Sequence, residues 1–349
     1  MSLQYTLERV QGRLRSGLQN ARHRWRTRSG LLVRLRDAEG FEGVGEASPL
    51  LGYSPDSLPE AEGWLRQWLA AHSGEALTAL PVVHEPAPPS AVFALETACL
   101  NLLAAKRQQP AWRVLAAELG RTEAEVVRVN GLITALDPDV AVVQARLLVL
   151  QGVVDIKLKV GRPEAFEVEC AAIEAVQAVL PEQGRVRVDA NQAFAAEALS
   201  ARLDTLAELG VALVEEPAPT PALLALDATP VSLLLDETLH TPSGLGPAQA
   251  LVRRGLASGW VLKPAVLGGL RRAAALAEQA TQLGATVSVS HLMDGGIAHG
   301  AYAALAVVVG GGPHGLAAHA GLEALGLHGA WPVTQGALHP DAAAMQAEP

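Results

Sequence analysis

The chain has 349 residues, of which 50% are hydrophobic, 18% charged and only 4% aromatic, and 27 basic against 36 acidic residues give a net charge of −9. This acidic balance argues against general nucleic-acid binding, which needs clustered Lys and Arg to displace phosphate counterions. No apolar run approaches the roughly 18 residues of a membrane span. The two cysteines, Cys99 and Cys170, form no disulfide framework, so we expect a reducing, cytoplasmic location.

The first 120 or so residues are strand-like at the start and helical afterwards. Residues 31–36 predict a strand and residues 37–40 the turn that follows it. Helices are expected at 57–71 and 90–105, with Ser57 and Ser90 as N-caps and a Pro-rich loop at 81–89 between them. We interpret the arginines at positions 22, 24, 26 and 28 mostly as a solvated basic face.

From about residue 124 short aliphatic runs alternate with Ala- and Leu-rich helical stretches, as expected for parallel strands joined by crossover helices. Eight such units predict a (β/α)8 barrel with its active site at the C-terminal ends of the strands. A doubly wound open sheet is the alternative, but no GxGxxG follows the first strand. The predicted strands are 126–133, 154–160, 185–189, 212–215, 231–236, 260–263, 286–290 and, more weakly, 315–319.

Five consecutive predicted strands end in an ionisable side chain, and such groups are rarely buried in a barrel unless they are paired or bind a metal. Three of them are carboxylates with no His or Cys among them, which favours Mg²⁺ over Zn²⁺. Lysines then flank the metal, and the nearby positive charges favour the neutral amine that a lysine base requires. The alternative is an inert network of ion pairs. In chain order these residues are Lys157 and Lys159, Asp189, Glu215, Asp236, and Lys263.

Two further acids, Glu216 and Glu237, each follow a proposed metal ligand directly. If the strand continues, they point to its other face. We therefore expect them to form a salt bridge or to support the neighbouring ligand.

Residues 157–159, 188–191, 214–217, 235–238 and 262–264 resemble the motifs of the enolase superfamily, muconate-lactonizing subgroup, which pairs a Lys or His base with Mg²⁺. The resemblance extends over nearly the whole chain, and segment 45–55 is similar to the o-succinylbenzoate synthase family in particular. It implies an α+β capping domain over 1–122 and a (β/α)8-type catalytic barrel over 123–320. The C-terminal segment 321–349 would pack back on the capping domain or be frayed.

By that resemblance, Lys159 would be the base that removes a proton α to a carboxylate, Lys263 would stabilise the anion from the opposite face, and Lys157 would tune Lys159. Mg²⁺, or Mn²⁺ as a substitute, would bind Asp189, Glu215 and Asp236 and hold the enediolate. The implied reaction is the dehydration of 2-succinyl-6-hydroxy-2,4-cyclohexadiene-1-carboxylate to o-succinylbenzoate, a menaquinone precursor. The implied partner is a small carboxylate, with no nucleic acid or membrane, and the oligomeric state stays open.

Four residues are candidates for substrate binding: Arg187, Asn191, Ser290 and Asp294. Arg187 would meet a substrate carboxylate or pair with an acid of the rim. Ser290 aligns with the seventh-strand segment of the family that receives the succinyl group, and Asp294 stands where that family often has Glu. The three histidines His291, His314 and His319 we interpret as packed or hydrogen-bonded side chains.

Two other functions stay open. The same lysine pair would serve an N-succinylamino-acid racemase or a dipeptide epimerase, although residues 315–319 lack the Asp-x-Asp pair typical of dipeptide epimerases. Cycloisomerisation of muconate is less favoured because of the capping segment. A barrel that binds a carboxylate without converting it is the alternative from another class.

Overall fold

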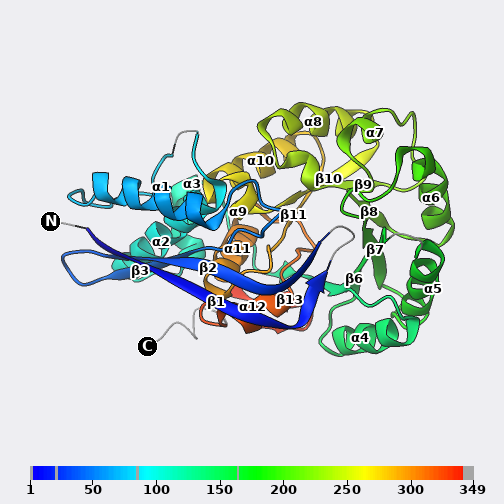
Figure 1. Cartoon of the computed structure of the whole chain (residues 1–349), viewed down its shortest axis with the longest axis horizontal. Coiled ribbons are helices and arrows are strands. Elements are labelled where there is room, and N and C mark those ends of the chain that lie inside the picture. Colours follow the sequence, from blue (N-terminus) through cyan, green and yellow to red (C-terminus); the bar gives the residue numbers. More distant parts are fainter. Residues whose placement is uncertain (1–2, 20–22, 84–85, 163–164, 341–349) are drawn as a thin grey trace.

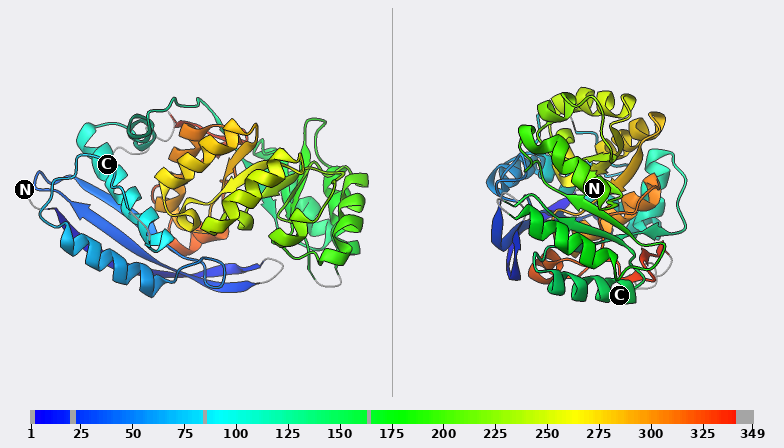
Figure 2. Two further views of the ribbon diagram at one scale, coloured as in Figure 1. Left: turned by 90° about the horizontal axis from the view of Figure 1, so that it is seen from above. Right: turned by 90° about the vertical axis from the view of Figure 1, so that its right-hand side faces the viewer.

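The computed structural model describes residues 3–19, 23–83, 86–162 and 165–340, which form two packed parts (Figure 1). One part is an antiparallel sheet covered by helices, and the other is a curled sheet of parallel strands with helices around its outside. Figure 2 shows both parts from above and from the barrel side. Within the described residues, no helix has the length and hydrophobicity needed to cross a membrane.

The N-terminal sheet has the order β1-β2-β3 and is antiparallel throughout. Leu31, Val33 and Leu35 are fully buried, and their spacing of two places them on the core face of the sheet. The predicted strand at 31–36 and the turn after it are confirmed, although the strand begins earlier. The three strands are β1 (Gln4–Gln19), β2 (Arg24–Arg36) and β3 (Glu42–Ala47).

Three helices pack on or beside this sheet: α1 (Leu58–Ala71), α2 (Pro89–Arg107) and α3 (Ala111–Leu119). Ser57 caps α1 in a capping box with Glu60, as predicted. The N-cap predicted at Ser90 is wrong. Because proline fits the first position of a helix, α2 already begins at Pro89, and the Ser90 hydroxyl instead donates to Asp56 Oδ2 at 2.6 Å.

The second part is a parallel sheet in the order β11-β10-β9-β8-β7-β6-β5, which curls into a barrel. Seven of the eight predicted strands are thereby confirmed, together with the fold class. The strands are β5 (Asn130–Ile133), β6 (Asp155–Lys159), β7 (Arg185–Asp189), β8 (Leu213–Glu215), β9 (Leu233–Leu235), β10 (Ala257–Leu262) and β11 (Thr286–Val289).

The strand predicted at 315–319 is wrong, because the chain there forms only an isolated bridge from Gly315 to Ser290, next to one from His314 to Val129. Pro313 has no backbone N–H to donate, and the three glycines before it adopt positive φ, so no regular strand leads into this segment. The segment still closes the barrel. Asn130 N donates to His314 O at 2.8 Å on the β5 side, and Gly315 N donates to Val289 O at 2.8 Å on the β11 side.

Helices connect the strands around the outside of the barrel (Figure 1). They are α4 (Pro138–Leu150), α5 (Phe166–Gln177), α6 (Ala196–Glu208), α7 (Thr220–Leu224), η1 (Glu237–Leu239), η2 (Pro242–Gly244), α8 (Leu245–Arg253), α9 (Pro264–Leu267), α10 (Leu270–Gln282) and α11 (Gly296–Val309).

Two of these helices receive their N-terminal caps from the other part of the molecule. Neither α10 nor α11 has a side-chain cap from its own N-cap glycine. Instead, Glu96 of α2 accepts from the backbone N–H groups of Leu270 and Arg271, at 2.5 and 3.2 Å. Glu46 of β3 accepts from Gly295 N at 2.6 Å at the start of α11. A carboxylate is favourable at a helix N-terminus because it meets unpaired N–H groups and the positive end of the helix dipole.

The C-terminal elements return to earlier parts of the chain. Helix α12 (Ala320–Leu325) contacts β1 and β2 of the N-terminal sheet. Strands β12 (Val333–Thr334) and β13 (Ala337–Leu338) form a small sheet with β4 (Val127–Arg128). Residues 341–349, which belong to the predicted C-terminal segment, lie outside the described residues, and the domain boundaries stay a prediction.

Candidate active site

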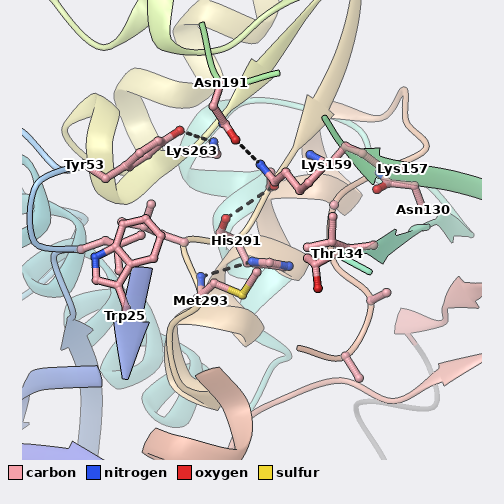
Figure 3. A pocket seen from close by; sticks show the side chains of 17 residues that line it. Trp25, Tyr53, Asn130, Thr134, Lys157, Lys159, Asn191, Lys263, His291 and Met293 are labelled. Atoms are coloured by element: carbon pink, nitrogen blue, oxygen red, sulfur yellow. Dashed lines mark hydrogen bonds between the residues drawn. The ribbon is translucent and has the colours of Figure 1, made fainter. Parts of the chain in front are cut away.

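A cavity lies where the barrel strands end (Figure 3). Trp25, Leu50 and Tyr53 of the N-terminal part form one wall, so both parts of the molecule contribute to the cavity. The polar side chains of the barrel wall are Asn130, Thr134, Lys157, Lys159, Asn191, Lys263, Ser290 and His291.

Strand β6 directs both of its lysines into this cavity, as expected for residues two apart on one strand. Lys157 Nζ donates to the two carboxylate oxygens of Glu215 at 3.0 and 3.1 Å. Lys159 Nζ lies 2.5 Å from Asp189 Oδ2 and donates to Asn191 Oδ1 at 2.8 Å. The ends of β6, β7 and β8 therefore form one connected polar cluster.

The third lysine, Lys263, follows β10 and forms an ion pair with Asp236. It also donates to the Tyr53 hydroxyl at 2.5 Å, and that hydroxyl donates to Asp236 Oδ2 at 3.1 Å. His240 Nε2 lies 3.1 Å from the other Asp236 oxygen. Tyr53 thus brings the N-terminal part into direct contact with the barrel's charged groups.

The three buried carboxylates titrate differently because their neighbours differ. Burial alone raises the pKa of Asp189, but Lys159 and the other lysines lower it more, so the net pKa falls well below the usual range. Asp236 behaves in the same way beside Lys263. Burial, together with the adjacent Asp189, raises the pKa of Glu215 to about 7. Three buried carboxylates this close together need neighbouring positive charges, which the lysine ammonium groups supply in this structure.

The donor set fits Mg²⁺ chemically, because Asp189, Glu215 and Asp236 are buried oxygen ligands at the ends of three neighbouring strands. In this structure, however, the three carboxylates are not arranged as a metal site. The described part of the chain contains no group of three or more His, Cys, Asp or Glu side chains that could hold a metal ion. Each of the three carboxylates contacts a lysine instead. Binding of a cation would therefore replace lysine–carboxylate contacts.

The two acids beside the proposed ligands support their neighbours. Glu216 accepts from Asp236 N at 2.7 Å and from the Thr238 hydroxyl at 2.6 Å. Glu237 Oε1 accepts from Asn191 Nδ2 at 2.8 Å. Both contacts fix the backbone or side chains around the ligand positions.

Of the four candidate substrate-binding residues, the structure brings two to the cavity. Asn191 and Ser290 line it. Arg187 is buried away from the cavity wall, with its guanidinium 3.4 Å from Pro313 O. Asp294 is also buried off the wall, and its carboxylate accepts from Arg28 and Tyr302.

His291 is packed and hydrogen-bonded, as the sequence indicated, and it also lines the cavity, which the sequence did not indicate. Its Nδ1 accepts from Met293 N at 3.2 Å, which leaves the ring proton on Nε2, and Figure 3 shows the ring directed into the cavity. Burial and the neighbouring, tilted ring of His319, with centroids 3.8 Å apart, hold the pKa of His291 well below its usual value. His291 therefore presents a neutral donor. Its position directly after Ser290, at the end of β11, was the available signal.

The predicted basic face is confirmed only in part. Arg24 and Arg26 are exposed, and Arg22 lies outside the described residues. Arg28 is buried instead, because the Asp294 carboxylate and four backbone carbonyl groups surround its guanidinium.

Two family models match the chain. Residues 140–344 match the enolase C-terminal domain-like family, and residues 4–102 match the N-terminal domain of MenC. The first match alone covers more than half of the chain.

Individual relatives agree with these matches. The o-succinylbenzoate synthase of Desulfotalea psychrophila is 31% identical over an alignment of 288 positions, which covers 72% of this chain and 76% of that protein. The L-Ala-D/L-Glu epimerase of Escherichia coli is 30% identical over an alignment of 260 positions, which covers 71% of this chain and 73% of that protein. The muconate lactonizing enzyme of Pseudomonas fluorescens, solved with muconolactone, shares the fold with a TM-score of 0.82 at 23% identity, covering 96% and 93% of the two chains.

Proposed function

This chain belongs to the enolase superfamily and, within it, to the o-succinylbenzoate synthase family, and from that membership we propose that it dehydrates 2-succinyl-6-hydroxy-2,4-cyclohexadiene-1-carboxylate to o-succinylbenzoate, with Mg²⁺ as cofactor. The observation that carries the proposal is the convergence of Lys157, Lys159 and Lys263 on one cavity, where they contact three buried carboxylates, Asp189, Glu215 and Asp236. The product would serve menaquinone biosynthesis.

The strand order supports the division of labour between the lysines. Strands β6 and β10 are four positions apart in the sheet, and the closing segment at 313–315 makes the ring one of eight positions. Lys159 and Lys263 therefore approach the cavity from opposite sides. One lysine removes the proton α to the substrate carboxylate, and the other stabilises the resulting anion from the far side.

In this mechanism Lys159 Nζ takes the ring proton and then delivers it to the hydroxyl that leaves from the same face. The C–H and C–O bonds break, the ring becomes aromatic and water is released. Lys157 holds Glu215 and Asp189 in place through its three contacts. Mg²⁺ bound by Asp189, Glu215 and Asp236 would supply Lewis-acid stabilisation of the negative charge on the substrate carboxylate.

A side-by-side assay tests the proposal. The purified chain with Mg²⁺ is given the cyclohexadiene substrate and, separately, an N-succinylamino acid, and the two values of kcat/KM are compared. We expect the higher value for the cyclohexadiene. Faster conversion of the amino acid would make racemisation the main activity.

Racemisation is the second candidate because two lysines on opposite sides can exchange one α-proton between the faces of an amino acid. The identity to an epimerase supports this activity. A dipeptide substrate is less favoured than a succinylamino acid, because segment 315–319 has no Asp-x-Asp pair that could bind the ammonium group of a dipeptide. Deuterium incorporation into an N-succinylamino acid in heavy water would support the racemase. A barrel that only binds carboxylates would show neither exchange nor turnover.

A further inference from the structure

Helix α4 carries an exposed apolar stripe on the outside of the barrel. Its inner face is anchored by Ala141 and Ala145, which are fully buried. Its outer face is apolar as well, although helices on the surface of a monomer normally have a polar outer face. The outer stripe consists of Val140, Val143, Leu147 and Leu150, with exposed fractions of 49%, 58%, 56% and 83%.

We propose that this stripe is a homodimer interface in which α4 of one protomer packs antiparallel against α4 of a second copy. The four positions are spaced by three, four and three residues, so the pattern reads the same in both directions. About a two-fold axis through its centre, Val140 faces Leu150 of the partner and Val143 faces Leu147. Self-complementarity of this kind is what a two-fold interface requires, and the spacing is that of the apolar seam in paired helices.

The size of the apolar patch is consistent with a second copy of the chain as the binding partner. The four side chains together expose the equivalent of more than two complete aliphatic side chains, and Val168 of the adjacent helix α5 is 47% exposed. Contiguous apolar patches larger than a few hundred Å² are rare on monomers, and the largest patch of a protein is often functional. A stable interface buries roughly 800 Å² per partner, with an apolar centre and a polar rim. The stripe supplies the centre, and the polar side chains along α4 supply the rim.

The surroundings of α4 disfavour a membrane surface or the chain's own C-terminal residues as the partner that covers the stripe. A membrane surface attracts helices rich in Lys and Arg, whereas α4 and its N-cap carry Asp137 and Asp139 against Arg146 as their one cation. The C-terminal residues 341–349, outside the described part, contain a single large apolar side chain, Met345, which is too little to cover four positions. Figure 1 places α4 at an outer corner of the barrel, at the edge of the molecule.

Sedimentation equilibrium of the full chain at micromolar concentrations tests the proposal. We expect a mass of two chains for the wild type and of one chain for the double variant Val143→Glu/Leu147→Glu, with circular dichroism confirming that the variant is folded. Val82→Glu is the matched control, because Val82 is 69% exposed on a loop elsewhere, and this variant should remain dimeric. A variant ending at residue 340 should also remain dimeric.

A disulfide tests the register independently of folding. Separately tagged Val143→Cys and Leu147→Cys proteins, both with Cys170→Ser, should form a mixed disulfide on oxidation. A monomeric wild type, a dimer that survives both glutamates, or loss of the dimer on truncation at residue 340 would each overturn the proposal.

Discussion

The guanidinium of Arg28 and the carboxylate of Asp294 form a buried ion pair, 3.0 Å apart, that joins the N-terminal sheet to the barrel. The same guanidinium donates to Pro49 O at 3.1 Å and to Met293 O at 2.8 Å. These carbonyl groups belong to two loops that also supply cavity residues, Leu50 and Met293. Arg28 is therefore a positioning residue that sets the distance between the two walls of the cavity.

Replacement of Arg28 by Ala should lower the free energy of unfolding by about 3–5 kcal/mol, because it leaves Asp294 buried without its cation. Urea denaturation measures the change. The matched control is Arg26→Ala at an exposed position of the same strand, which should change stability by less than about 0.5 kcal/mol. Equal stability of the two variants would show that the buried pair contributes nothing.

Replacement of Lys159 by Ala should lower kcat by about 10²–10⁴-fold, because the proposed base is lost. A steady-state assay with Mg²⁺ and the cyclohexadiene substrate measures it. Lys106→Ala is the control, since Lys106 pairs with Asp37 at the surface and should leave kcat unchanged. Full activity of the Lys159 variant would exclude it as the base.

Chelation with EDTA should abolish turnover, and added Mg²⁺ should restore it. The variant Asp236→Asn should need a much higher Mg²⁺ concentration for half-maximal activity, because a neutral amide is a weaker ligand than a carboxylate. The exposed Asp139→Asn serves as the control. If both variants titrate with Mg²⁺ like the wild type, Asp236 is not a ligand.

Replacement of His291 by Phe should raise KM for the succinyl-bearing substrate about 10–100-fold while kcat changes little. A hydrogen bond to a charged group contributes roughly 1.5–3 kcal/mol, and His291 offers a neutral donor in the cavity. His72→Phe, at the end of α1, is the control. A drop in kcat with unchanged KM would contradict a role in substrate binding.

Acid should destabilise the protein partly through His314. Burial, together with Arg187, lowers the pKa of His314 to about 3, and its Nδ1 accepts from Val289 N at 2.9 Å. The unfolded histidine takes up a proton near pH 6.5 while the folded one does not, so stability is lost as the pH falls below 6.5.

The expected loss from His314 is about 3 kcal/mol between pH 7 and pH 4.5. His314→Asn, which keeps an acceptor for Val289 N, should flatten the pH dependence of the unfolding free energy by that amount. Parallel curves for His314→Asn and the wild type would refute the assignment.

Residues at the ends of regular strands were predictable because alternation along a strand determines which side chains share a face. Lys157, Lys159 and Lys263 line the cavity for this reason. Arg187 shares the face of Asp189 but donates to Pro313 O, a contact between positions 126 residues apart that spacing along one strand does not reveal. Asp294 and Arg28 were misinterpreted because their pairing joins positions 266 residues apart. Local pattern says nothing about such contacts. His291 depends on loop geometry after β11, which is equally invisible to periodicity.

The carboxylates of Glu46 and Glu96 cap two barrel helices from the outside of the barrel, which limits how this enzyme can be recombined. A barrel expressed alone would leave the first N–H groups of α10 and α11 without their acceptors. A chimera with the N-terminal part of a relative needs a carboxylate at both positions, whichever substrate its cavity accepts. The N-terminal part and the barrel therefore have to match each other at two helix ends that lie far from the reacting atoms.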